Sequence, residues 1–154
     1  CANIIISFSV NSADAARKYE QGAPAPEERM ATARLLKQQG WRVRIRLDPI
    51  IRGFGYAAII EEIRRLGPER VTLGALRVEA NLRDRIPREL VEQLDPAPQP
   101  KAYARYPVAE RLAMYRAAND VLRSVCPVGL CEETAEIWDA LALDKESFCC
   151  NCGK

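Results

Sequence analysis

The sequence predicts an α/β fold in the form of a partial parallel βα barrel, equivalent to the C-terminal half of a complete one. Over the first 95 residues, segments rich in β-branched and apolar residues alternate with segments of strong helix formers. Short connections marked by glycine and proline separate these segments, which is typical of parallel βα units. Three such units are too few to close a barrel. One face of the first two expected strands is also polar, which the lumen of an open barrel would explain.

The first part of the chain contains three expected strands and three expected helices. The strands are predicted at residues 4–10, 41–47 and 70–76 from their apolar and β-branched runs. The helices are predicted at residues 27–39, 56–66 and 85–94 from helix formers and from apolar residues at helical spacing. Gly40 ends the first helix, Pro49 closes the second strand and Gly67 ends the second helix.

After the three units, a proline-rich connector at residues 95–100 leads to the rest of the chain. We expect a helix at residues 107–125, one more short strand at residues 128–131 and a last helix at residues 132–143. The expected organisation is therefore three βα units in residues 1–95, a helical and strand extension in residues 96–148, and a cysteine-rich tail in residues 149–154.

Composition excludes several classes of protein. Of the 154 residues, 48% are hydrophobic and 29% are charged, which excludes a disordered chain. The apolar runs are too short to span a bilayer, so we expect no membrane association. The chain has no histidine, which excludes histidine as its catalytic base or metal ligand. The net charge of +2 is too small to indicate a nucleic-acid binder by itself.

The placement of the cysteines bears on the compartment and on the completeness of the chain. Five of the six lie from Cys126 onward, and 124 residues separate Cys1 from Cys126, unlike a secreted disulfide scaffold. We therefore expect a cytoplasmic protein. The chain begins with Cys1 directly before an apolar run, so we expect it to be a piece of a longer protein.

The predicted strands each have one apolar and one polar face. Alternation along the first strand puts Ser7, Ser9 and Asn11 opposite the apolar side chains. Along the second strand, alternation puts four polar residues opposite the apolar ones: Arg42, Arg44, Arg46 and Asp48. A ligand-filled lumen would explain this polar face. Two alternatives remain: the second strand is an exposed edge whose arginines face solvent, or the serines and Asn11 merely end the first strand.

Polar residues also gather where the predicted strands end. Ser9, Asn11, Asp48 and Gly74 all lie at carboxyl ends, the edge at which parallel α/β folds bind ligands. Hydroxyl and amide groups suit ribose hydroxyls or an amino-acid head group, and a carboxylate suits hydroxyls or an ammonium group.

An ordered set of short segments resembles a known family. The segments are Phe8-Ser9-Val10-Asn11, Tyr19-Glu20-Gln21-Gly22, Glu28-Arg29, Ala31, Gly40-Trp41, Asp48-Pro49-Ile50-Ile51 and Gly55-Tyr56. Together they resemble the C-terminal half of the spore photoproduct lyase-like family of the radical SAM superfamily. Leu73-Gly74-Ala75-Leu76-Arg77, Arg105-Tyr106, Arg111 and Tyr115 extend the similarity to the wider family, over residues 3–131.

The resemblance implies a partial barrel that holds S-adenosylmethionine and a [4Fe–4S] cluster. The activity that the resemblance implies is radical repair of thymine dimers in DNA, a lyase reaction. The family binds its cluster through a CxxxCxxC loop, which this sequence lacks. We therefore expect the cluster ligands and the catalytic residues to lie upstream, in a missing N-terminal half of the barrel that would be this chain's partner.

The resemblance also assigns site residues. By position, Ser9 matches a serine that contacts S-adenosylmethionine, and we expect Asn11 and Asp48 to contact the same cofactor. Arg77 matches an arginine that points toward substrate, and strand alternation places Arg46 on the same polar face. The segment from Arg42 to Arg88 contains 11 arginines and no lysine, which favours phosphate contacts and hence a DNA partner.

Two further groups of residues have competing interpretations. Cys149, Cys150 and Cys152, with Cys126 and Cys131, would supply thiolates for zinc or a second iron–sulfur cluster, or else be a reduced tail with no metal. Tyr103, Tyr106 and Tyr115 among arginines predict a stacking surface for nucleic acid, or else Tyr115 is a core residue. Two other functions therefore stay open: a non-catalytic α/β module that binds a nucleotide-like ligand, and a metal-binding interaction domain.

Overall fold

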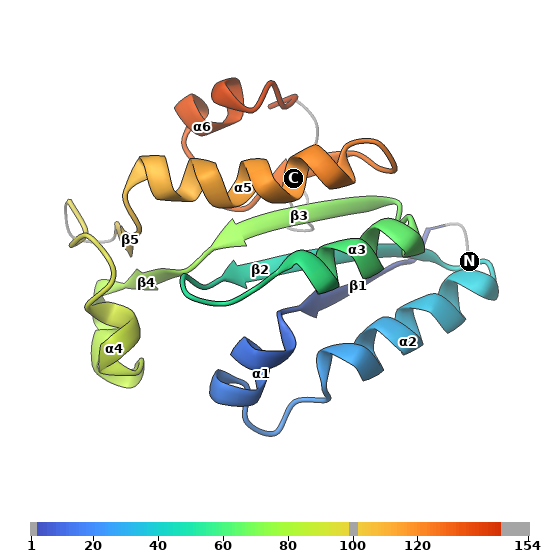
Figure 1. Ribbon diagram of the computed structural model, residues 1–154, viewed down its shortest axis with the longest axis horizontal. Coiled ribbons are helices and arrows are strands. Elements are labelled where there is room, and N and C mark those ends of the chain that lie inside the picture. The colour runs from blue at the N-terminus through green and yellow to red at the C-terminus, as the bar shows by residue number, and fades with distance from the viewer. Residues whose placement is uncertain (1–2, 99–101, 146–154) are drawn as a thin grey trace.

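The computed structural model describes residues 3–98 and 102–145, and its centre is a four-stranded parallel sheet (Figure 1). The strands lie in the order β1 (Ile5–Val10), β2 (Arg42–Ile50), β3 (Arg70–Ala75) and β6 (Val128–Leu130). Every neighbouring pair is parallel. The prediction of a mixed α/β chain with parallel strands, consistent with a partial βα barrel, is therefore confirmed.

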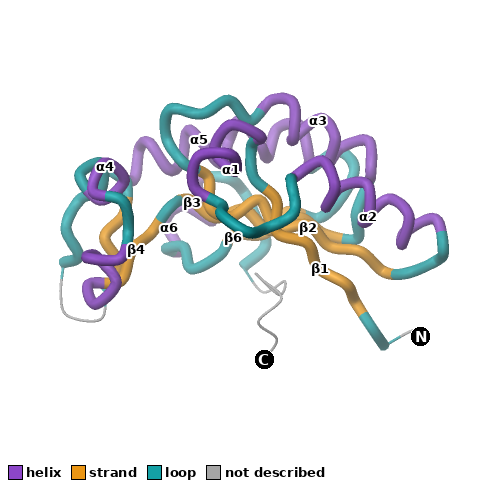
Figure 2. The backbone as a smooth tube through the Cα atoms, turned by 90° about the horizontal axis from the view of Figure 1, so that it is seen from below, coloured by secondary structure: helices purple, strands orange, loops and turns teal. Residues whose placement is uncertain are grey.

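Three helices cover one face of this sheet, as Figure 2 shows with the strands below them: α2 (Pro26–Gln38), α3 (Ala57–Leu66) and α5 (Val108–Leu122). The strand side chains beneath them are buried and apolar, and include Val43, Ile45, Leu47, Val71 and Leu73. Burial of one such side chain contributes about 1.5–3 kcal/mol. The helix-covered face therefore holds the core, and the opposite face is left to polar residues.

Shorter elements surround the carboxyl ends of the strands. They are α1 (Ala13–Tyr19), β4 (Arg77–Glu79), a 3₁₀ helix (Ala80–Arg85), α4 (Arg88–Val91), β5 (Tyr103–Arg105) and α6 (Ala135–Ala140). β4 and β5 pair antiparallel directly after β3. The sequence analysis did not predict α1, which begins where Ser12 accepts a hydrogen bond from the backbone N–H of Ala15 at 3.2 Å.

One expectation is confirmed and one alternative is excluded. The expected short strand at residues 128–131 exists as β6, and it pairs with β3 as the fourth strand of the main sheet. The alternative in which the second strand is an exposed edge is wrong, because β2 lies between β1 and β3.

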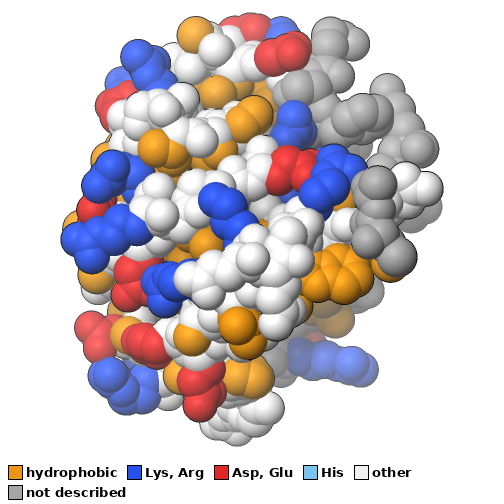
Figure 3. Space-filling model, turned by 90° about the vertical axis from the view of Figure 1, so that its right-hand side faces the viewer, with side chains coloured by type: hydrophobic (Ala, Val, Ile, Leu, Met, Phe, Trp, Pro, Cys, Tyr) orange, Lys and Arg blue, Asp and Glu red, His pale blue; other side chains and the backbone are white. Residues whose placement is uncertain are grey.

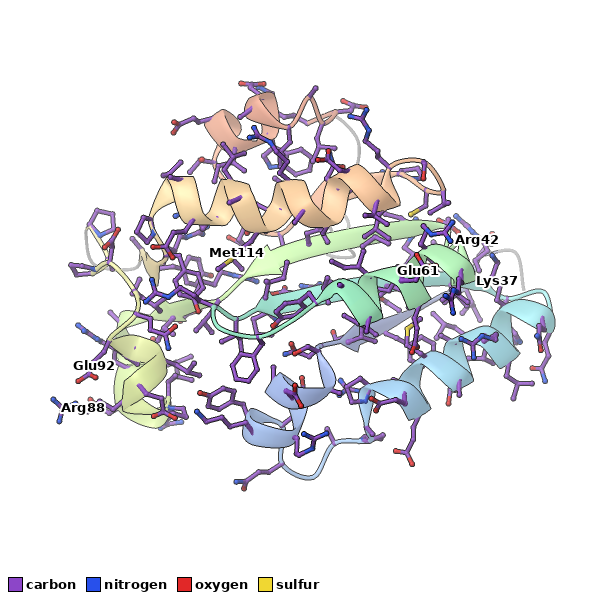
Figure 4. The ribbon with its side chains drawn as sticks, viewed as in Figure 1. Lys37, Arg42, Glu61, Arg88, Glu92 and Met114 are labelled. Carbon is purple, nitrogen blue, oxygen red and sulfur yellow. The ribbon has the colours of Figure 1, made fainter. Side chains whose placement is uncertain are left out.

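The end of the sheet at which the strands begin is held by ion pairs and helix contacts. Arg44 and Arg42 both pair with Glu69, at 2.6 and 2.5 Å. Lys37 donates to the backbone carbonyls of Leu66 and Gly67 at the end of α3, and Figure 4 shows Lys37 and Arg42 together at this end. Figure 3 faces this side, where positive and negative side chains are interspersed. Among the described helices, none is long and apolar enough to cross a membrane.

Candidate functional site

The face of the sheet opposite α2, α3 and α5 carries a row of polar side chains near the ends of the strands. Ser9 on β1 is in register with Arg46 on β2, which is in register with Thr72 on β3, which is in register with Gly129 on β6. Residues in register point to the same side of a sheet. The prediction that Ser9 and Arg46 share a polar face is therefore confirmed as geometry, with Ser9 exposed and Arg46 half-buried.

Asp48 holds two arginines together at this edge. Its Oδ2 accepts from Nη2 of Arg46 at 2.9 Å, and its Oδ1 accepts from Nη1 of Arg77 at 3.1 Å. The Asp48 side chain is 10% exposed, and those of Arg46 and Arg77 are 22% and 19% exposed. Charge-assisted hydrogen bonds in such a shielded place are stronger than exposed ion pairs. Three of the predicted site residues thus form one cluster.

Gly74 on β3 makes room for this cluster. A Cβ atom at position 74 would lie 2.5 Å from both Cγ and Oδ1 of Asp48. Such distances are far inside van der Waals contact, so the Asp48 carboxyl group lies directly against the backbone of β3. The glycine is required for close approach and not for an unusual backbone angle.

Cys131 completes the cluster from the end of β6. Its Sγ lies 3.2 Å from Nη2 of Arg46 and 3.2 Å from Nη2 of Arg77, and the residue is 3% exposed. The pKa of the Arg77 guanidinium is raised: burial lowers it, but the Asp48 hydrogen bond and the charges of Asp48 and Cys131 outweigh that effect. Arg77 is therefore charged throughout the accessible pH range.

Asn11 does not share the face of Ser9. It is 1% exposed, and its Oδ1 accepts from the backbone N–H of Ser12 at 2.9 Å and from the hydroxyl of Tyr56 at 2.8 Å. The Tyr56 hydroxyl also accepts from the backbone N–H of Ile51 at 2.8 Å. β1 ends at Val10, so strand alternation no longer applies to Asn11. Asn11 joins the ends of β1 and β2 instead of facing a ligand beside Ser9.

A second buried network fixes the end of β3. The Glu133 side chain is 1% exposed, and its Oε1 accepts from the Tyr115 hydroxyl at 2.7 Å and from Arg111 Nε at 3.0 Å. The same hydroxyl accepts from the backbone N–H of Ala75 at 2.8 Å. Burial, and the neighbouring negative charge of Glu133, raise the pKa of Tyr115. Tyr115 is therefore a neutral donor that ties α5 and the chain after β6 to the strand that leads to Arg77.

Of the three tyrosines predicted to form a stacking surface for nucleic acid, only Tyr103 has an accessible ring. Tyr106 and Tyr115 are fully buried, so the interpretation of Tyr115 as a core residue is confirmed. Tyr103 is half-buried, and the guanidinium carbons of Arg105 and Arg77 lie 5.1 and 5.9 Å from its ring centre. A cavity of about 290 Å³ adjoins Tyr103 and is lined in part by Asp48 and Arg77. The cluster around Asp48 is thus reached from a hollow beside an aromatic ring.

A different cavity, of about 380 Å³, lies between α3 and α5 on the helical side of the sheet. Its lining is mainly apolar and includes Ile60, Met114 and Val121, and Figure 4 shows where Met114 lies on α5. No predicted site residue belongs to its lining. The polar site and this apolar cavity are therefore on opposite layers of the molecule.

The proposed cysteine metal site is not assembled by the described residues. Cys149, Cys150 and Cys152 lie outside the described part of the chain. Cys126 and Cys131 are placed before and after β6, and a strand rises about 3.3 Å per residue, so they cannot share one metal ion. Within residues 3–98 and 102–145, no three acidic or cysteine side chains are grouped as metal ligands.

Comparisons with known proteins agree with this geometry. No family model matches the sequence, and no curated protein matches it. Two solved structures of spore photoproduct lyase variants do match the fold, with TM-scores of 0.65 and 0.63 and 17% sequence identity. Each match covers 82% of this chain and 43% of the other, so the chain spans less than half the length of those proteins. The first was solved with AdoMet and a dinucleoside spore photoproduct bound.

The fold is that of a partial βα barrel, and it is shared with part of these spore photoproduct lyase structures. The expected fold class is confirmed by these matches, and the level of identity shows shared architecture alone. In this partial barrel, the helices form the outer layer, and the row from Ser9 to Cys131 lies on the inner face of the sheet.

Sequence reasoning missed Cys131 and Glu133 as members of these polar clusters. Cys131 follows an apolar strand, which suggested a small buried residue or a metal ligand. Cys131 is 85 residues from Arg46 and 54 residues from Arg77 in the sequence. A local sequence pattern cannot predict contacts between residues so far apart in the chain. Glu133 stands beside Glu132 in a charged stretch that resembles a solvated surface.

Proposed function

We propose that this chain is part of a radical SAM lyase that acts on DNA, and that it supplies strands facing the cofactor and the substrate. The observation that carries the proposal is the cluster of Asp48, Arg46 and Arg77 on the face opposite α2, α3 and α5, at the carboxyl edge of the strands. Ligands of parallel α/β folds bind at this edge. The fold shared with spore photoproduct lyase supports the choice of chemistry.

Within this proposal, Ser9 and Asp48 hold the cofactor. The exposed Ser9 hydroxyl both donates and accepts, which suits the hydroxyl and amino-acid groups of S-adenosylmethionine. Both Asp48 oxygens accept from arginines, and a carboxylate has about four acceptor sites, so Asp48 can also accept from a hydroxyl or ammonium group of the cofactor. When bound and reductively cleaved at a [4Fe–4S] cluster, S-adenosylmethionine supplies the radical that begins the reaction.

The described residues do not provide a binding site for the [4Fe–4S] cluster. Cys126 and Cys131 are separated by β6, and both are buried against protein groups. Within this proposal, the ligands of the iron–sulfur cluster lie in another part of the parent protein, and no step of the chemistry is assigned to a cysteine of this chain.

Arg46 and Arg77 are the proposed contacts to the substrate. Two guanidinium groups that share one carboxylate keep a net positive charge, and guanidinium forks match phosphate oxygens. DNA is the proposed substrate because its phosphates carry that charge and because Tyr103, beside Arg77, offers a ring for base stacking.

The deciding experiment uses the longer protein that contains this chain, reconstituted with iron and sulfide and reduced anaerobically. We expect release of 5′-deoxyadenosine from S-adenosylmethionine by that protein and none by residues 1–154 alone. Release by residues 1–154 alone would place the cluster ligands inside this chain and contradict the proposal. Cofactor binding by the longer protein without cleavage would instead support a non-catalytic ligand-binding module.

Binding of the cofactor is tested separately by Ser9→Val. If Ser9 contacts S-adenosylmethionine, its loss leaves a polar partner unsatisfied and weakens binding by about 1–3 kcal/mol. Ser124→Val is the matched control, because Ser124 is an exposed serine that bonds its own helix end, at Val121. Equal dissociation constants for the two variants would remove Ser9 from the site.

A further inference from the structure

Arg29 reaches from the helical layer to the backbone of the strand that carries Ser9. Arg29 lies in the first turn of α2, and its Nη1 donates to the backbone carbonyl of Ser9 at 3.0 Å. Within the part of the sheet that the structure describes, β1 is the outermost strand, with β2 as its neighbour on one side. The carboxyl end of β1 is therefore held by a side chain from α2 as well as by the strand beside it.

Glu20 fixes the direction of the Arg29 guanidinium group. Nη2 of Arg29 donates to Oε2 of Glu20, the residue at which α1 ends, and the two side chains are 16% and 24% exposed. A guanidinium group is planar, and its N–H donors point in fixed directions. Because Glu20 holds Nη2, Nη1 is aimed at the Ser9 carbonyl. One rigid group thus joins the end of α1, the start of α2 and the end of β1.

The helix start from which Arg29 projects is itself fixed. Pro26 occupies the first position of α2, where its restricted backbone angle suits a helix. One Glu28 side-chain oxygen, Oε2, accepts from the backbone N–H of Ala25 at 2.9 Å, directly before the helix. Both features reduce fraying of the turn that carries Arg29. The donor to the Ser9 carbonyl therefore comes from a rigid part of the helical layer.

The carbonyl that Arg29 holds controls how the Ser9 side chain is presented. The peptide group between Ser9 and Val10 is planar, so the direction of its carbonyl fixes the backbone angle ψ of Ser9. Val10 is 1% exposed in the core, whereas Ser9 is exposed on the face opposite α2. A hydrogen bond made from the helical layer therefore sets the orientation of a hydroxyl group on the other face of the sheet.

We propose that Arg29, aimed by Glu20, is a positioning residue for Ser9 and so raises the affinity of the site for S-adenosylmethionine. The effect on affinity rests on the proposed function, in which Ser9 contacts this cofactor. Without Arg29 the end of β1 gains backbone freedom, which binding then has to remove. Since β2 still holds the strand on its other side, we expect cofactor binding to weaken by about three- to tenfold.

Nuclear magnetic resonance tests the hold on Ser9 without any cofactor. In the longer protein that contains this chain, serine is isotopically labelled at its carbonyl carbon and valine at its nitrogen, so that only serine–valine pairs are detected. Residues 1–154 contain two such pairs, Ser9-Val10 and Ser124-Val125, and the signal lost in Ser9→Ala identifies the first. Arg29→Met removes the donors and keeps the apolar stem. We expect it to move the Ser9 signal and to leave the Ser124 signal in place.

Two further variants complete this measurement. Arg34→Met is the matched control, because Arg34 is exposed on the same helix, and the Ser9 signal should stay where it is. Glu20→Ala keeps Arg29 but removes the acceptor of its Nη2, so the Ser9 signal should move there too; this variant decides the question if Arg29→Met does not fold. A Ser9 signal that stays in place when Arg29 or Glu20 is replaced would overturn the proposal.

Dissociation constants of S-adenosylmethionine test whether Arg29 acts through Ser9. In the longer protein, Arg29→Met should weaken binding when Ser9 is present and should have little effect in a Ser9→Val background. An equal loss in both backgrounds would show that Arg29 merely stabilises the fold, and would overturn the proposal. If the native longer protein binds no S-adenosylmethionine, the proposed function fails and the effect on affinity fails with it. The Ser9 signal then still decides whether Arg29 holds this residue.

Discussion

Replacing Gly74 with alanine tests whether the cluster at the strand ends is built as described. The new Cβ would lie 2.5 Å from Cγ and Oδ1 of Asp48 and 2.9 Å from Oδ2, so the carboxylate has to move. Movement breaks its bonds to Arg46 and Arg77, each charge-assisted and worth about 1.5–3 kcal/mol when made in a protein. Both arginines are partly exposed and regain some hydration, so we expect a loss of about 2–4 kcal/mol in the free energy of unfolding.

Urea unfolding of Gly74→Ala beside Gly55→Ala measures this loss. A Cβ at position 55 would have no heavy atom within 4 Å, so that variant should change stability by less than about 1 kcal/mol. The second comparison is Gly74→Ala in an Asp48→Ala background, where the clash with the carboxylate is gone and the cost should largely vanish. An equal cost in both backgrounds would refute the reasoning, because the strain would then come from something other than Asp48.

Three further outcomes are expected. Arg77→Ala should weaken DNA binding by the parent protein and reduce the slope of log binding constant against log salt concentration by about one. Arg64→Ala, an exposed change on α3, is the control. Equal slopes for Arg77→Ala and the parent protein would contradict a phosphate contact. Tyr115→Phe should lower the free energy of unfolding by about 2–3 kcal/mol, because the buried Ala75 N–H loses its acceptor; a change below about 0.5 kcal/mol would contradict this. Burial raises the pKa of Tyr56 to about 12, above its unfolded value near 10, so stability should be full below about pH 10 and fall as the pH rises toward 12. Urea unfolding at about pH 9 and pH 11 should show a smaller fall for Tyr56→Phe than for the native protein, and an identical fall would exclude Tyr56 as a contributor.

Local sequence determined the elements of the sheet and the face on which each strand residue lies. Val43, Ile45 and Leu47 alternate with Arg44 and Arg46, and the pleat of a strand sends such a series to opposite sides wherever the strand is placed. The polar face was therefore predictable from β2 alone. Alternation failed at Asn11, because β1 ends one residue earlier and the hydrogen bond to Tyr56, from a segment 45 residues away, decides where that side chain points.

The sequence by itself determined parallel βα units, a polar inner face and the membership of Ser9, Arg46, Asp48 and Arg77 in it, because periodicity and strand ends are local properties. Only the tertiary structure decided that β6 is the fourth strand of the same sheet, and that Cys131 therefore meets Arg46 and Arg77. A contact between residues 54 or 85 positions apart depends on strand order. Strand order is set by the packing of the whole core, which no local window of sequence contains.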